Sequence, residues 1–152
     1  MLHFTTSPEV QPGRDPNLSA ETMTERYWPE GYTTVSPYLI VNGAAETIDF
    51  VIRVFDAQEV RRFPREDGRV MHSELRIGDS LVMIADGVPP EWPACEAHVH
   101  VYVADVDATY TAALEAGAAA VQAPTQREGD EDRRGGVKDA GGTTWWIASR
   151  VR

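Results

Sequence analysis

The chain has 152 residues, of which 42% are hydrophobic and 25% are charged, as is typical of one folded domain of ordinary size. Its formal net charge of −10 argues against nucleic acid as a partner, because phosphate backbones bind basic surfaces, and it favours ligands that carry positive charge. The single cysteine, Cys95, rules out an intrachain disulfide, and no apolar run is long enough to span a bilayer. The N-terminus also lacks the pattern of a signal peptide, so we expect no membrane partner and a cytoplasmic location.

Residues 1–32 differ in composition from the rest of the chain. They contain Pro8, Pro12, Pro16 and Pro29 and show no sustained hydrophobic periodicity. Segments of this kind rarely fold alone. We therefore expect an irregular N-terminal arm over 1–32 and one domain over 33–152.

The first half of that domain predicts one helix and four strands. Ile48, Val51, Ile52 and Phe55 recur at helical spacing, so residues 44–55 predict an amphipathic helix. Asn42 and Gly43 precede this segment, where a turn and a helix cap are expected. The alternation of apolar and polar residues predicts strands over 33–41, 58–63, 70–77 and 80–85.

The same order of elements then repeats. The second set consists of a strand over 97–103, a helix from Asp105 or Asp107 to Ala116, and strands over 119–123, 134–138 and 143–149. Val41 precedes Val103 by 62 residues, and Ile84 precedes Ile147 by 63 residues. A nearly constant offset indicates an internal duplication. We predict an α+β fold of two βαβββ modules, over 33–86 and 97–150.

Side-chain alternation identifies a polar face in each module. In the strand from Ala97, the residues His98, His100 and Tyr102 share one face, opposite a row of valines. The valines are expected to pack on the helix, which leaves the polar side chains to line a concave pocket. The offset and the alternation of the other strands add further residues to this face: Ser36, Tyr38, His72, Glu74, Met83 and Trp146.

Several stretches of the sequence carry a family resemblance. They are Ser36–Ala45, Asp67–Ser80, His98–Ala108, Asp132–Asp139 and Thr143–Ala148. In this order they resemble the vicinal-oxygen-chelate superfamily, which includes glyoxalase I, extradiol dioxygenases and the bleomycin- and fosfomycin-resistance proteins. More narrowly, they resemble its PhnB-like branch. The resemblance covers residues 30–152 and implies curved mixed sheets around a concave pocket.

The resemblance also implies where a metal would bind. The metal enzymes of the superfamily take one ligand from the first and the last strand of each module, and these positions here are Ser36, Met83, His98 and Trp146. Only His98 is a good ligand for a divalent ion. The usual metal site is therefore expected to be lost, with His98 as its one surviving candidate ligand, and no cofactor is expected.

Three functions follow as alternatives. The first is metal-independent binding of a small, cationic or aromatic organic molecule, with Arg133 as a candidate clamp for an anionic group. The second is a lyase, isomerase or dioxygenase in which His98, His72 and Glu74 hold a divalent metal. The third is an inert or partner-binding domain whose own side chains fill the concave face. No catalytic residue is assigned, because no nucleophile elbow or phosphate-binding loop is present.

The sequence also predicts a homodimer. Two short sheets expose open edges, which related proteins commonly close by pairing or exchanging modules between chains.

Overall fold

The computed structural model describes residues 27–151. Its internal contacts divide the chain into two units, residues 1–31 and residues 32–152. Most of the predicted arm, residues 1–26, lies outside the described residues. The elements of the second unit are β1 (Tyr38–Val41), α2 (Ala44–Phe55), β2 (Gln58–Pro64), β3 (Val70–Ile77), β4 (Ser80–Asp86), β5 (Ala97–Tyr102), α3 (Val106–Glu115), β6 (Ala119–Gln126), β7 (Asp132–Lys138) and β8 (Thr143–Arg150).

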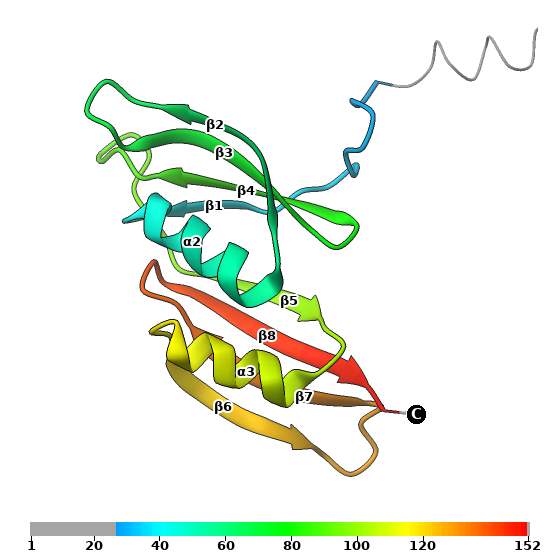
Figure 1. Cartoon of the computed structure of the whole chain (residues 1–152). Helices are drawn as coiled ribbons and strands as arrows, with labels where there is room; N and C mark the ends of the chain where they lie inside the picture. The colour runs from blue at the N-terminus through cyan, green and yellow to red at the C-terminus, as the bar shows by residue number, and fades with distance from the viewer. Residues whose placement is uncertain (1–26, 152) are drawn as a thin grey trace, which may run out of the picture. The chain divides into compact units, whose positions relative to one another are not determined.

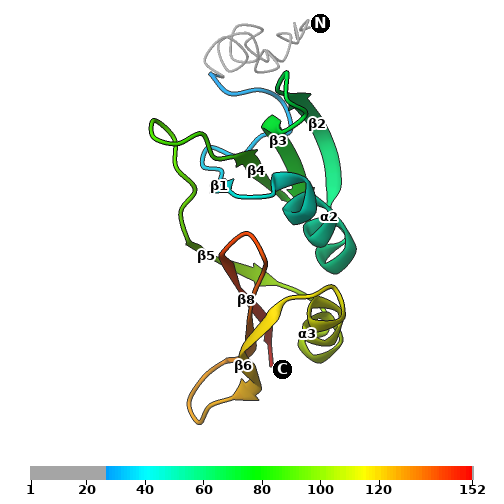
Figure 2. The same cartoon turned by 90° about the vertical axis from the view of Figure 1, so that its left-hand side faces the viewer.

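These strands form two sheets of four, with the orders β1-β4-β3-β2 and β5-β8-β7-β6. In each sheet the first pair is parallel and the others are antiparallel. One helix lies against one face of each sheet (Figures 1 and 2). The predicted α+β fold of two βαβββ modules is therefore confirmed.

The duplication extends to the register of the strands. Tyr38 lies opposite Met83 in the first sheet, and His100 lies opposite Trp146 in the second. These two pairs are related by the offsets of 62 and 63 residues that the sequence shows. The two modules therefore place equivalent residues at equivalent points of their sheets.

The start of the first strand differs from the prediction. The first strand begins at Tyr38 and not at Thr33, because Pro37 has no backbone N–H to donate to a ladder. Ser36 therefore lies ahead of the strand, in contact with the Thr33 hydroxyl at 3.4 Å. The helix cap expected at Asn42 and Gly43 is present: Gly43 occupies the cap position of α2, and its φ of 78° lies in the left-handed region that glycine tolerates.

The hydrogen-bond acceptor for the first backbone N–H groups of α2 comes from a residue distant in the sequence. The Asp86 carboxylate, at the end of β4, accepts hydrogen bonds from the backbone N–H groups of Gly43 and Ala44 at 3.1 and 2.9 Å. Its other oxygen accepts from the N–H of Val70 at 2.7 Å. Asp86 thus joins the helix, β3 and β4 of the first module.

One apolar core includes residues of both modules. Trp145 is fully buried in it, and the indole Nε1 donates to the Asp139 carboxylate at 2.8 Å. The ring of Phe55, at the end of α2, lies 5.0 Å from the Trp145 ring, so the two modules touch through these aromatic side chains. Among the described residues, no helix is long and apolar enough to cross a membrane.

Candidate functional site

The second module presents a polar face from β5 and β8. His98, His100 and Tyr102 are exposed on β5, whereas Val101 on the opposite side is buried. Trp146 of β8 is partly exposed next to His100, and its neighbour Trp145 is in the core. The alternation that the sequence predicts for this face is present in the structure.

Trp146 and His98 form the central pair of this face. The indole Nε1 of Trp146 donates a hydrogen bond to Nδ1 of His98 at 3.1 Å. The two rings are nearly parallel, with an interplanar angle of 9° and centroids 6.2 Å apart. On the other side of β8, the benzo ring of Trp146 covers Gly136, where a Cβ atom would lie 2.7 Å from the ring. A glycine is therefore required beneath the indole.

This hydrogen bond fixes the tautomer of a neutral His98 ring. An indole N–H can only donate, so Nδ1 of His98 must accept and its proton must be on Nε2. The face therefore offers an aromatic surface from Trp146 beside an N–H donor from His98.

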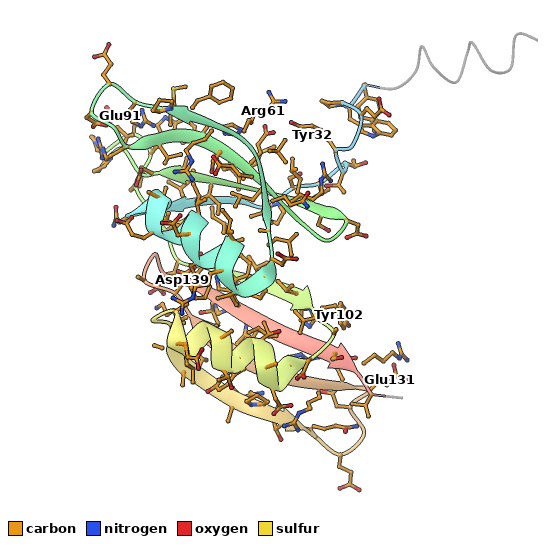
Figure 3. The ribbon with its side chains drawn as sticks, in the orientation of Figure 1. Tyr32, Arg61, Glu91, Tyr102, Glu131 and Asp139 are labelled. Atoms are coloured by element: carbon orange, nitrogen blue, oxygen red, sulfur yellow. The ribbon has the colours of Figure 1, made fainter. Side chains whose placement is uncertain are left out.

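Tyr102 lies at the end of β5, where Figure 3 shows it. Its hydroxyl donates to the buried Asp132 carboxylate at 2.9 Å, and this bond, followed by the charge of Asp132, raises the pKa of Tyr102. A guanidinium nitrogen of Arg134 also lies 3.5 Å from the Asp132 carboxylate, so Tyr102, Asp132 and Arg134 form one polar group. Arg134 was not among the predicted site residues, although the alternation of β7 places it on the same face as Trp146.

The first module carries a second polar cluster, around Glu74 of β3. Glu74 is only 5% exposed and is partnered by three side chains. His72 Nε2 and Arg61 Nε lie 3.0 Å from its oxygens, and the Tyr32 hydroxyl donates to it as well. Figure 3 shows Tyr32 and Arg61 close together beside this sheet.

The pKa of Glu74 reflects two opposing causes. Burial raises it, but the hydrogen bonds from Tyr32 and His72, together with the charge of Arg61, outweigh burial and hold the pKa below its usual value. Glu74 is thus a buried carboxylate that is hydrogen-bonded within the first module and by Tyr32. It was predicted to line a wet concavity, whereas Tyr32 and Arg61 cover it.

The remaining side chains of this cluster are aromatic or apolar. The His72 ring contacts the rings of Tyr38 and Phe63, with centroids 5.6 and 6.4 Å apart. Met83 lies between Tyr38 and Glu74 in the sheet register. Tyr32 and Arg61 were not among the predicted site residues. Tyr32 falls in the predicted arm, and a register shift in β2 just before Arg61 changes the face of the sheet to which its side chain points.

Arg133 does not lie with the other predicted site residues. Its guanidinium forms two hydrogen bonds with Asp107, at 2.8 and 2.7 Å, in the first turn of α3. Arg133 therefore points to the face of the sheet that carries the helix, opposite Trp146. An anionic ligand on the polar face would not reach it.

The residues present do not fit a divalent metal at the positions that the family resemblance implies. Trp146 has no lone pair to offer, and its indole N–H occupies Nδ1 of His98. His72 and Glu74 bond to each other in the first module, separately from His98. Within residues 27–151, no group of three or more His, Cys, Asp or Glu side chains is arranged to hold a metal ion.

A cavity of about 620 Å³ lies beside β5. Its walls include Val54 and Phe55 of α2, Val82 of β4 and the residues of β5. Of the predicted site residues, only His100 and Tyr102 line it. The other predicted pocket residues thus lie on two open faces outside this cavity.

Comparisons with known proteins agree with this fold. Residues 31–147 match the family model described as the Glyoxalase/Bleomycin resistance protein/Dioxygenase superfamily. An uncharacterised protein of Mycobacterium tuberculosis strain H37Rv is 36% identical over 151 residues, covering 92% of this chain and 85% of that protein.

Two solved structures are similar in fold. TnmS3, an antibiotic binding protein from Streptomyces sp. CB03234, matches 79% of this chain and 100% of its own, at 17% identity and a TM-score of 0.59. A PhnB protein of Bacillus cereus, described as a putative 3-demethylubiquinone-9 3-methyltransferase, matches 77% of this chain and 99% of its own, at 18% identity and a TM-score of 0.59. At such identities the likeness concerns the fold alone.

Proposed function

Because the chain belongs to the glyoxalase/bleomycin resistance protein/dioxygenase superfamily, we propose that it binds a small planar organic molecule without a metal. The binding surface is the polar face of the second module, centred on Trp146 and His98. Within the superfamily, we assign the chain to the PhnB-like branch on the motifs that its sequence carries.

The hydrogen bond between Trp146 and His98 is the observation that carries this proposal. It leaves the Nε2–H of His98 as a donor beside an indole surface, which suits an aromatic ring that carries a carbonyl or ether oxygen. His100 and Tyr102 add an imidazole and a phenol along the same strand. TnmS3 supports the proposal as an antibiotic-binding protein of similar fold.

The charge of the chain narrows the class of ligand further. A net charge of −10 produces a field that attracts cations and repels anions. Arg133 is paired to Asp107 on the other face, and Arg134 on the polar face is paired to Asp130 and Asp132, so neither guanidinium favours an acidic ligand here. We therefore propose a neutral or cationic aromatic molecule.

The test is a binding screen of the full chain in the presence of a chelator. Planar aromatic metabolites and antibiotics are added in EDTA, and the thermal midpoint and indole fluorescence are recorded. We expect a ligand that stabilises the parent protein and binds roughly tenfold more weakly to Trp146→Phe, which keeps a ring but loses the N–H donor. Trp92→Phe, which changes an exposed indole outside this face, is the matched control and should bind as the parent does.

The outcome that contradicts the proposal is a metal-dependent one. A protein purified without chelator that contains stoichiometric Zn, Fe, Mn or Ni, and loses it on His98→Ala, would favour the alternative of a metal-dependent lyase, isomerase or dioxygenase. A screen in which Trp146→Phe and Trp92→Phe bind every ligand equally would remove Trp146 from the site.

A further inference from the structure

We propose that the cavity beside β5, which shares His100 and Tyr102 with the polar face, is a second binding site and that it takes an organic ammonium ion with an apolar body. It does not rest on the proposed function, because Trp146 and His98, on which that binding depends, do not line the cavity. Three features of the cavity carry it: its apolar walls, the free backbone edge of β5, and the negative charge at its rim.

The walls provide room and apolar contact for a small molecule. The volume of about 620 Å³ lies within the range of roughly 300–1,000 Å³ that small-molecule sites occupy. Val54 and Phe55 at the end of α2, Val82 of β4 and Val101 of β5 line it. These side chains come from both modules, so the cavity is a product of their packing.

The strand β5 contributes its backbone as well as its side chains. All residues from Val99 to Ala104 line the cavity, whereas side chains alone would line it only at alternate positions. Val103 N–H donates to β8, so the odd-numbered residues of β5 bond to β8 and the even-numbered ones point their N–H and C=O groups to the other edge. Among the described residues, no strand pairs with that edge. The carbonyl oxygens of His100 and Tyr102 are therefore available to accept from an ammonium N–H.

The charges at the rim are negative. Asp56 ends α2, so its carboxylate lies at the helix terminus where the backbone dipole is also negative. Asp79, in the turn before β4, is the second acidic residue of the lining. None of the residues that line the cavity in the described part of the chain is Lys or Arg. A cation is therefore favoured over a neutral molecule of the same shape.

The experiment uses 3-phenylpropylamine, which is cationic at neutral pH, and 3-phenylpropanol, its uncharged analogue. Each is titrated into the full chain, and the methyl signals of Val54, Val82 and Val101 are followed by NMR. We expect saturable shifts of these methyls with the amine, and binding roughly tenfold weaker for the alcohol. The double variant D56N/D79N should weaken amine binding by a similar factor. Asn accepts the left-handed backbone conformation that Asp56 has, so this variant is expected to fold.

The matched control is D49N/E66Q, which removes the same two charges from exposed positions outside the cavity. It should bind the amine as the parent does. Equal binding of amine and alcohol, or an equal loss in both double variants, would overturn the proposal. So would shifts confined to the Trp146 indole and His98, a result that would still support binding at the polar face.

Discussion

Trp146 occupies a position at which the family resemblance implies a metal ligand, and it changes what its neighbours can do. Its ring needs a glycine beneath it, at Gly136, and its N–H needs an acceptor, at His98. Both requirements are met by residues on adjacent strands. Trp146 thus provides an aromatic surface at this position and leaves the Nε2–H of His98 as a donor.

The Gly136→Ala variant tests this arrangement. The new Cβ atom would lie 2.7 Å from the Trp146 ring, so the indole must shift, and we expect its hydrogen bond to His98 to weaken. We expect a loss of about 1–3 kcal/mol in the free energy of unfolding and a changed indole emission. In a Trp146→Ala background the same change should cost much less. An equal cost in both backgrounds, measured by urea unfolding, would show that Trp146 does not cover Gly136.

Glu74 leads to a prediction about pH. Its pKa is held below the ordinary value in the folded state, so its partners stabilise the protein above the unfolded pKa, and this contribution is lost as pH falls through the folded pKa. Glu74→Gln should therefore be less stable than the parent by about 1–3 kcal/mol at neutral pH, and the difference should shrink on acidification. Chemical unfolding at a series of pH values measures this. The exposed carboxylate control, Glu66→Gln, should show no such trend; a difference for Glu74→Gln that grows in acid would contradict the account.

Among the helices and strands, the bounds that depend on the spacing of nearby side chains were predicted correctly. The helix over 44–55 and the strand over 70–77 have the predicted bounds, because each follows from the spacing of its own apolar side chains. The predicted start of β1 was wrong, because it depends on Pro37, and the contact of Asp86 with the start of α2 was not predicted, because Asp86 is 43 residues from Gly43. Hydrogen bonds between residues so distant in sequence leave no periodic signal.

The two helices offer a comparison of their caps. Asp86→Ala would leave three backbone N–H groups without their acceptor, and we expect a loss of about 2–4 kcal/mol in stability. Asp105, at the start of α3, is exposed and accepts one N–H, from Ala108 at 3.0 Å. Asp105→Ala should cost about 0.5–1 kcal/mol. Thermal unfolding that ranks the two variants in the reverse order would contradict the role of Asp86 as the link between elements.

At the scale of the whole molecule, the polar faces were predictable from the duplication and the alternation of the strands, which need only the sequence. The partners of Glu74, the tautomer of His98 and the placement of Arg133 opposite Asp107 were not, because they depend on side-chain geometry. The cavity beside β5 was not predictable either, since it arises from the packing of one module on the other.

We also propose that the protein is a homodimer. Strand β1 lies at the edge of its sheet and pairs on one side only, and open edges are commonly closed by a second chain. Phe63 and Met71, 44% and 47% exposed, add apolar surface on the first sheet. Light scattering at micromolar concentration should give twice the 16.8 kDa of one chain. A mass equal to that of one chain would refute the dimer.

The central claim is that Trp146 holds His98 as a hydrogen-bond donor that is unavailable to a metal. Side-chain ¹⁵N NMR of His98 tests it most directly, at about pH 8, where free imidazoles are neutral. The account predicts an unprotonated Nδ1, a protonated Nε2, and signals that do not change when Zn²⁺ is added. A proton on Nδ1, or a shift of Nε2 to a zinc-bound position on addition of Zn²⁺, would contradict it.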